Sequence, residues 1–221
     1  MSPPTSEAEP FRRLPQQARS RQRVNQILDV AAQVFEEVGY EAASTELIAT
    51  RANTSIGSLY RFFPDKSAIL YTLADRYAHE MRSLFAAQIN SSTVHHPIAK
   101  VLSNTVDAFD KFYTNQPGCR VIMLQSRVSA ELQAVNKRAD REIVAQLDGF
   151  FAQRQPKMEP ERRRVAALVS VEIAGALQLL SLAQDDELRR QIVAETKQVL
   201  TSYLQPLFPD AEHILNVEGT Q

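Results

Sequence analysis

Apolar residues recur at the three- and four-residue spacing of amphipathic helices along almost the whole chain. In the first such segment, residues 21–38, one side of the helix carries Val24, Ile27, Leu28, Ala31, Phe35 and Val38, and Gly39 is placed to end it. The same spacing predicts further helices over residues 66–89, 98–113, 119–128, 132–151, 165–183 and 187–204. The pattern therefore predicts an all-α protein.

Two shorter helices, joined by a tight turn, are predicted between residues 45 and 64. Ala49 is small enough for two helices to cross closely, Asn53 tolerates the left-handed backbone of a turn, and Ser55 can cap the second helix. The apolar contact that holds their angle is expected from Leu47, Ile48, Leu59 and Phe62. The second helix then exposes Ile56, Gly57, Ser58, Tyr60 and Arg61. This small, polar and aromatic face suits a groove of DNA.

The predicted elements group into two domains joined by the long helix that begins at Lys66. A helix-turn-helix domain is expected over residues 21–65 and a second helical domain over residues 66–208. Residues 1–20 are rich in proline and charge, which predicts a disordered basic arm, and residues 209–221 are expected to form a flexible tail.

Net charge adds little to this picture, because 25 basic residues nearly balance 26 acidic ones. A nucleic-acid partner would therefore have to be bound by a local basic patch. Such a patch is formed by Arg12, Arg13, Arg19, Arg21 and Arg23. The single cysteine, Cys119, fits a reducing compartment, and residues 1–20 lack the apolar stretch of a signal peptide. We therefore expect a cytoplasmic protein.

Residues 165–183 are apolar enough to raise the question of a membrane span. Glu172 lies near the centre of this segment, where a carboxylate costs about 2.5–3.5 kcal/mol in a bilayer, so we interpret the segment as a buried helix of a soluble bundle. Such a helix can contact its own domain on one side and a second copy of the chain on the other. The helices at about 161–183 and 187–204 are therefore the predicted homodimer interface.

The run Gly57 to Lys66, with the sequence GSLYRFFPDK, is specific in both residue type and spacing. Together with the matching residues of Ile27 to Phe35, Gly39 to Ala42, Leu47 to Ala49 and Ala52 to Ser55, it resembles the DNA-binding domain of the TetR family of bacterial regulators. The resemblance covers about residues 20–77 and implies an N-terminal three-helix helix-turn-helix domain followed by a helical ligand-binding and dimerisation domain. Asn53, Ile56 and Arg61 depart from the usual pattern, which leaves the operator sequence open.

The resemblance also implies roles for individual residues. Hydroxyls, cations and helix N-termini bind phosphate oxygens, so Thr45, Tyr60, Arg61 and Lys66 are expected to contact the DNA backbone. Gly57 would allow close approach of the backbone, while Ile56 and Ser58 are the best candidates for base contact, Ile56 through a thymine methyl group. Ser55, which can cap the second helix, is also expected among the DNA-binding residues. The alternative for Tyr60 is a packing role, and for Lys66 a solvated charge.

A ligand pocket is expected among the helices of the second domain, where the resemblance places the effector. Its candidate residues are Phe85, Phe109, Phe112, Tyr113, Met123, Phe150, Phe151 and Glu172. An aromatic stripe of this kind also fits a plain apolar core. If Glu172 lines the pocket, a cationic or hydroxyl-bearing ligand is favoured, and if it pairs with an arginine its role is structural.

We interpret the chain as a homodimeric, ligand-responsive transcriptional repressor that binds a palindromic DNA operator and is released by a small-molecule effector. The alternative is a helical small-molecule sensor or protein-interaction module without sequence-specific DNA binding, which Ile56 and the near-zero net charge favour. A helical carboxylate metalloenzyme is a weaker alternative, because no Glu-x-x-His pair occurs. His95 and His96 lack accompanying ligands at metal spacing, so neither a metal site nor a cofactor is expected.

Overall fold

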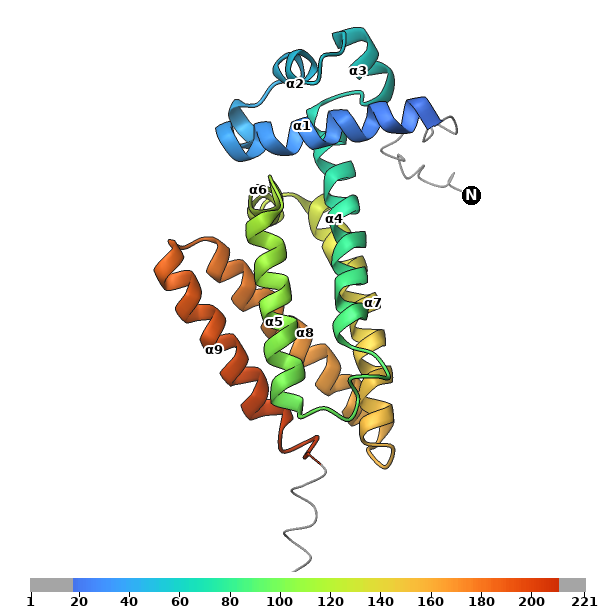
Figure 1. The fold of residues 1–221 in the computed structure, drawn as a ribbon, viewed down its shortest axis with the longest axis vertical. Helices are drawn as coiled ribbons and strands as arrows, with labels where there is room; N and C mark the ends of the chain where they lie inside the picture. Colours follow the sequence, from blue (N-terminus) through green and yellow to red (C-terminus); the bar gives the residue numbers. More distant parts are fainter. Residues whose placement is uncertain (1–17, 211–221) are drawn as a thin grey trace, which may run out of the picture. The chain divides into compact units, whose positions relative to one another are not determined.

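The structure is a computed structural model that describes residues 18–210, and the described part of the chain is helical with no strand (Figure 1). The helices are α1 (Ala18–Ala42), α2 (Thr45–Arg51), α3 (Ile56–Phe62), α4 (Lys66–Gln88), α5 (Ile98–Asn115), α6 (Cys119–Gln125), α7 (Ala130–Arg154), α8 (Pro160–Leu182) and α9 (Asp186–Leu204). The predicted all-α fold class is confirmed.

Helix boundaries follow from side chains that accept hydrogen bonds from free backbone N–H groups. The Ser44 hydroxyl accepts from the N–H of Leu47 at the start of α2, and the Ser55 hydroxyl accepts from that of Ser58 at the start of α3. The Asp65 carboxylate accepts from the N–H of Ala68 at 2.8 Å and so caps α4. These caps place each helix start where the sequence predicts it.

Helix α1 begins earlier than predicted, and beyond the predicted end at Gly39 it continues only across a kink. It begins at Ala18, so Arg19 lies on the helix and not in an arm, while Arg12 and Arg13 lie outside the described residues. Gly39 adopts φ 77°, a left-handed backbone that breaks the helical geometry, yet helical hydrogen bonding resumes as far as Ala42. The kink turns the last turn away, and Val38, expected in the apolar stripe, is 39% exposed.

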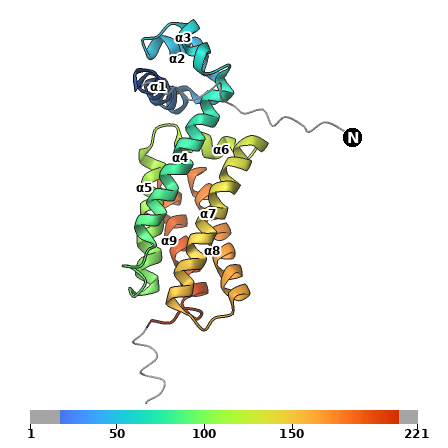
Figure 2. The same cartoon turned by 90° about the vertical axis from the view of Figure 1, so that its right-hand side faces the viewer.

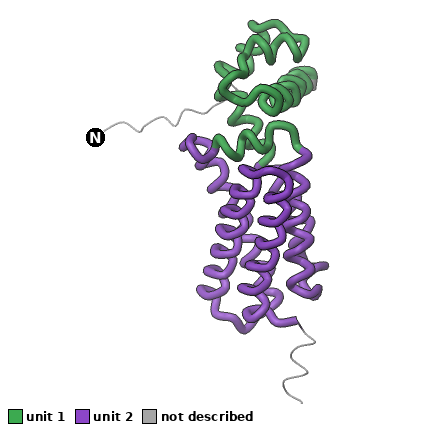
Figure 3. Tube along the Cα trace, turned by 90° about the vertical axis from the view of Figure 1, so that its left-hand side faces the viewer, with its two compact units in different colours: residues 1–77, 116–125 green, residues 78–115, 126–221 purple. Residues whose placement is uncertain are grey.

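The chain forms two compact units, shown in green and purple in Figure 3. The first contains residues 1–77 and 116–125, and the second contains residues 78–115 and 126–221. The sequence predicts a single boundary at residues 65 and 66. The structure differs because α4 contributes its first three turns to the first unit and because α6, far along the chain, returns to pack on α1.

The return of α6 depends on a close backbone contact. Gly118 has φ +71°, and a Cβ added there would lie 2.8 Å from the carbonyl oxygen of Ala32. The backbone N–H of Gly118 donates to the Glu36 carboxylate at 2.9 Å, and the Tyr77 hydroxyl donates to the carbonyl of Pro117 at 2.6 Å. Only glycine fits this position, because any side chain would strike α1.

The core of the first unit is formed by fully buried side chains, among them Ile27, Phe35, Ile48, Leu59 and Phe63. Phe63 replaces the predicted Phe62 in this core. Helix α3 ends at Phe62, and the extended backbone of Phe63, with φ −128°, coincides with burial of its ring.

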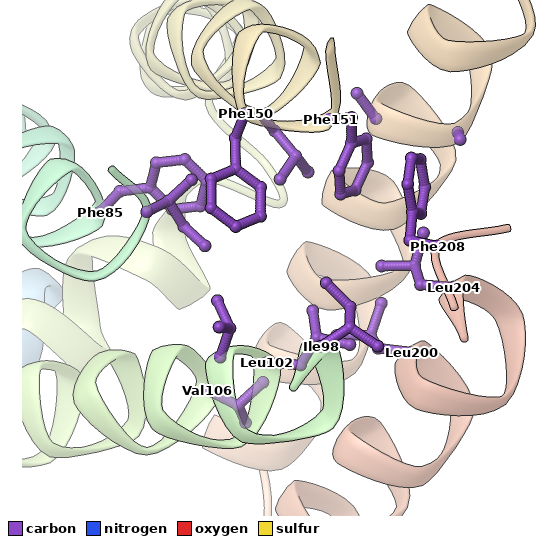
Figure 4. Close-up of a cluster of buried hydrophobic side chains, with 14 of the residues drawn as sticks. Phe85, Ile98, Leu102, Val106, Phe150, Phe151, Leu200, Leu204 and Phe208 are labelled. Carbon is purple, nitrogen blue, oxygen red and sulfur yellow. The ribbon is translucent and has the colours of Figure 1, made fainter. Parts of the chain in front are cut away.

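The core of the second unit lies among α5, α7, α8 and α9, which run alongside one another (Figure 2). Figure 4 shows part of this apolar cluster, with Phe150 and Phe151 from α7, Ile98 and Leu102 from α5, and Phe208 beyond the end of α9. Ion pairs join neighbouring helices around it, including Arg189 with Asp110 and Arg163 with Asp148. Burial and ion pairing thus hold the same helices together.

Helix α8 is long and apolar enough to cross a membrane, with a mean hydropathy of 1.9 over a window of which 28% is buried. Core helices of soluble proteins meet the same criterion. Helix α8 lies between α7 and α9, and its small residues Ala166, Ala167 and Ser170 are buried in the second unit. These contacts assign α8 to the helical bundle.

The segment after α9 is ordered further than the predicted tail allows. Phe208 is 1% exposed, and its ring stacks on Phe151 with centroids 4.1 Å apart. The Asp210 carboxylate accepts hydrogen bonds from Arg154 and from the backbone N–H of Ile98. Residues 211–221 of the predicted tail lie outside the described residues.

Candidate functional site

The turn between α2 and α3 is stabilised by hydrogen bonds within the motif and by hydrogen bonds from α1. Asn53 takes φ 48°, the left-handed backbone that the sequence predicts there. The N–H of Thr54 donates to the carbonyl of Ala49 at 3.0 Å. From α1, the Gln26 amide donates to the carbonyl of Ala52 at 3.0 Å and Arg23 donates to the Thr54 hydroxyl at 3.3 Å. Helix α1 therefore fixes the angle at which α3 leaves the turn.

Helix α3 presents the predicted face to solvent. Ile56 is 37% exposed and Tyr60 is 45% exposed, Gly57 and Arg61 are also exposed, and Ser58 is half-buried. A Cβ added at Gly57 would meet nothing within 4 Å. Because the fold itself does not need a glycine there, the open position is free for a close approach from outside the chain.

Two predicted phosphate contacts lie side by side. The Thr45 hydroxyl, at the start of α2, lies 3.1 Å from the Tyr60 hydroxyl on α3. Thr45 is buried to 8% exposure, and its hydroxyl also donates to the Glu46 carboxylate at 3.3 Å. The pair joins the two helices of the motif and presents the exposed Tyr60 hydroxyl at their junction.

Lys66 does not have the free ammonium group that a phosphate contact needs. Its Nζ donates to the carbonyls of Tyr40, Glu41 and Ala43, at 2.6, 3.2 and 2.9 Å, and lies 4.4 Å from the centre of the Tyr40 ring. An ammonium group has three donors, so these bonds use all of them. As placed, Lys66 closes the C-terminal end of α1, and its phosphate contact stays a prediction.

The remaining predicted DNA contacts differ in how much they are already engaged. Ser55 uses its hydroxyl to cap α3, at 3.2 Å from the N–H of Ser58. The Arg61 guanidinium lies over the ring of Phe62, 5.0 Å from its centre, and remains exposed. Arg61 is therefore available to an anion, while Ser55 mainly supports the helix that carries it.

The predicted ligand residues are divided between the two units. Seven of them are in the second unit, whereas Met123 lies on α6 in the first unit. Phe85 packs edge-on against Phe109 with ring centroids 6.4 Å apart, and Phe109 and Phe112 contact Tyr113 at 6.2 and 5.9 Å. These aromatic residues, with Phe150 and Phe151, belong to or border the apolar core of the second unit.

The sequence leaves two alternatives open for Glu172, a pocket residue or a structural ion pair, and both stay predictions. Glu172 is exposed on α8, and no ion pair is found for it among the described residues. Its carboxylate influences Asp140 on α7, whose pKa is raised to about 6, first by burial and then by the charge of Glu172. Glu172 thus belongs to a pair of carboxyl groups on the surface of the second unit.

Sequence reasoning missed the residues that fasten the end of the second unit. Arg154 has a side chain that is 8% exposed and donates to Asp210, and these residues are 56 positions apart. The sequence carries no local signal for this pairing, because arginines and aspartates occur throughout the chain.

Models of two protein families match the chain. The family described as bacterial regulatory proteins of the tetR family matches residues 27–72. The family described as tetracyclin repressor-like C-terminal domain matches residues 97–204. The first match contains α2, α3 and the turn between them, and the second covers most of the second unit.

Known proteins agree with these family matches. HTH-type transcriptional repressor KstR of Mycobacterium tuberculosis is 26% identical over 152 residues, covering 68% of this chain and 67% of that protein. The A-factor receptor protein of Streptomyces griseus is 42% identical over 59 residues, 27% of this chain but only 21% of the receptor. A TetR-family transcriptional regulator from Streptomyces coelicolor superimposes with a TM-score of 0.61 at 25% identity, covering 83% of this chain and 98% of that structure.

Proposed function

Because the chain belongs to the TetR family of bacterial DNA-binding transcriptional regulators, we propose that it represses its target genes as a homodimer bound to a palindromic operator. Members of this family are transcription factors and not enzymes. A small-molecule effector held in the second unit releases the DNA. Operator DNA lies in the cytoplasm of a bacterium, and we place the protein there.

The exposed face of α3 supports DNA binding more than any other observation. Ile56, Ser58 and Gly57 form the part that enters the major groove, with Gly57 leaving room for the DNA. Tyr60 and Arg61 contact phosphates at its edge, and Thr45 orients the Tyr60 hydroxyl. Lys66 is left out of this set, since its donors are engaged by α1.

The dimer is proposed to form through α8 and α9. Large apolar residues on these helices are exposed in the single chain, namely Val165, Leu168, Leu180, Leu188 and Val199. Burying such a surface against a second copy would supply the hydrophobic contribution that dimerisation requires. Two copies would present two α3 helices to the halves of one operator.

In the experiment, the purified protein first selects the fragments of genomic DNA that it binds. Its affinity for the selected fragments is then measured by fluorescence anisotropy. Tyr60→Phe removes one hydroxyl and is expected to weaken binding about tenfold on every bound sequence. Tyr203→Phe, a matched change in the second unit, should bind like wild type. If the protein selects no DNA sequence, the proposed function is wrong and the alternative of a sensor without DNA binding, which exposed Ile56 favours, takes its place.

A further inference from the structure

The C-terminal end of α7 carries a buried arginine with an unusual set of partners. Arg154 has only 8% of its side chain exposed. Its Nη1 donates to the carbonyls of Val94 and His96, both at 2.6 Å, and its Nη2 donates to Oδ1 of Asp210 at 2.6 Å. The third donor, Nε–H, is buried and has no partner. These hydrogen bonds thus use both Nη nitrogens of the guanidinium and leave its buried Nε–H unused.

A second donor points at the same carboxylate oxygen. The backbone N–H of Ile98, at the N-terminus of the 18-residue helix α5, donates to Oδ1 of Asp210 at 2.9 Å. Helix N-termini carry free N–H groups and partial positive charge, so they favour anions. Arg154 and the start of α5 together form a cradle for one carboxylate.

Asp210 does not use all the hydrogen-bond donors of this cradle. A carboxylate that faces the Nε–H and Nη2–H edge of an arginine accepts two parallel hydrogen bonds. From Arg154, Asp210 accepts only the bond from Nη2, at its Oδ1. Its Oδ2 lies 3.5 Å from the amide of Gln205. A free carboxylate, not tied to a chain segment, would satisfy both donors. The orphaned Nε–H therefore marks a site built for a better-placed anion than the one it holds.

An apolar position adjoins the cradle along the same segment. Phe208 is 1% exposed and stacks on Phe151, with Leu204 also buried beside it in the cluster of Figure 4. In the sequence, Pro209 is the one residue between Phe208 and Asp210. Residues 208–210 thus present an apolar group and a carboxylate a short distance apart, which is the chemistry of an apolar carboxylic acid.

We propose that Arg154 and the N-terminus of α5 form a carboxylate-binding site for the effector, which the chain's own residues 208–210 occupy in the absence of ligand. An apolar carboxylic acid displaces them, placing its carboxylate on Arg154 and its apolar part where Phe208 lies. The inference deepens the proposed function, on which it rests for the role of the ligand.

The charge of Arg154 makes the exchange selective. Burial lowers the pKa of this guanidinium, and the Asp210 carboxylate raises it again. A buried cation that lost its carboxylate would remain uncompensated, so only an anionic ligand can replace Asp210 at low cost. Asp210 keeps 26% of its side chain exposed, so the exchange can begin from solvent.

Displacing Asp210 changes the contacts at the start of α5. The N–H of Ile98 exchanges a partner on the chain for one on the ligand. Helix α5 continues to Asn115, directly before the Gln116 to Gly118 turn that is fastened to α1. The covalent path from the site to the first unit is therefore a single helix.

The test measures the preference of the full-length protein for decanoate over 1-decanol by calorimetry, because the two probes differ only in the carboxylate. Asp210→Ala removes the competing carboxylate and is expected to raise this preference about tenfold, or ~1.4 kcal/mol. Asp210→Glu keeps a carboxylate and should leave it near the wild-type value. Arg154→Gln should abolish the preference.

An unchanged preference in Asp210→Ala overturns the proposal, even if Arg154→Gln fails to fold. Operator binding without ligand is measured in parallel by anisotropy. If Asp210→Ala leaves the preference for decanoate unchanged while the protein still binds its operator, the carboxylate site is refuted and the proposed function stands. If the preference for decanoate changes in the variants as expected but the protein binds no DNA, the carboxylate site is supported and the proposed function is refuted.

Discussion

Lys66 in the first unit and Arg154 in the second are both cations that bind backbone carbonyls at the end of a structural segment. Lys66 donates to three carbonyls around the end of α1 and has no donor left. Arg154 donates to two carbonyls and to Asp210 and retains a buried Nε–H without a partner. All the donors of Lys66 are used inside the fold, whereas the buried Nε–H of Arg154 requires an explanation, which the proposed carboxylate site supplies.

Replacing Arg154 should produce the largest effect on folding. Arg154→Met leaves Asp210 and the carbonyls of Val94 and His96 without their donor, and breaking such a buried pair is expected to cost about 3 kcal/mol of unfolding free energy. Urea denaturation measures this change. Arg190→Met, which removes an exposed ion pair with Glu187, should leave stability close to the wild-type value. Equal effects of both changes would contradict the importance of the buried contacts.

Gly118 lies in a crowded position and Gly57 in an open one, so we expect substitutions at these two glycines to affect stability differently. Gly118→Ala forces a side chain into a left-handed backbone against the Ala32 carbonyl, and we expect a loss of roughly 2–3 kcal/mol in stability. Gly57→Ala meets no atom within 4 Å and lies in a helix, so stability should be unchanged or rise by up to ~1 kcal/mol. DNA affinity should nevertheless fall in Gly57→Ala. Thermal melts and anisotropy separate these outcomes.

Lys66→Met tests whether a saturated cation takes part in DNA binding. The three carbonyls at the end of α1 lose their donor, which we expect to cost about 2 kcal/mol of stability. The slope of log affinity against log salt should stay at its wild-type value. A slope reduced by about one unit would restore the phosphate contact that the family resemblance implies. Lys111→Met, at an exposed position of α5, is the matched control.

The smallest predicted effect concerns Asp140. Burial, followed by the charge of Glu172, raises the pKa of Asp140 from its ordinary 3.8 to about 6. The folded protein therefore binds this proton more tightly than the unfolded chain, so the contribution to stability is complete below about pH 4 and is lost as pH rises through 6. The full shift is equivalent to ~3 kcal/mol, but partial exposure and solvent screening reduce our expectation to about 1 kcal/mol.

The Asp140 effect is measured by denaturation at pH 4 and pH 8. Asp140→Asn should be more stable than wild type at pH 8 and equal to it at pH 4. Glu172→Gln should move the transition of the wild-type profile to lower pH, since it removes the neighbouring charge. A profile that is the same in all three proteins would show that Asp140 titrates normally.

The sequence predicts the helix-turn-helix well because its determinants are local. Asn53 and the caps Ser55 and Asp65 act within four residues of their own positions, so their chemistry can be inferred from spacing. Phe63 is missed because helical periodicity says nothing about the residue after a helix ends. The side chain that continues the core there depends on how the backbone turns.

Other features depend on residues far apart in the chain. Lysine binds phosphates and carbonyls through the same donors, and only the folded chain brings Tyr40, 26 residues away, to Lys66. Chain order places α6 with the C-terminal helices, whereas in the fold Gly118, directly before α6, lies close against the backbone of Ala32 in the first unit. The Arg154 cradle combines a helix end, a loop and residues beyond α9, none of which is informative alone.

The position of α6 has a consequence for how the protein is made. The first unit is discontinuous in sequence, so a ribosome must synthesise through Gln125 before its last helix can dock on α1. Until then, α1 lacks its contact with Gly118 and the packing of α6, whose Cys119 is buried to 1% exposure in the finished fold. The N-terminal domain therefore completes its folding only after α4 and α5 have been synthesised.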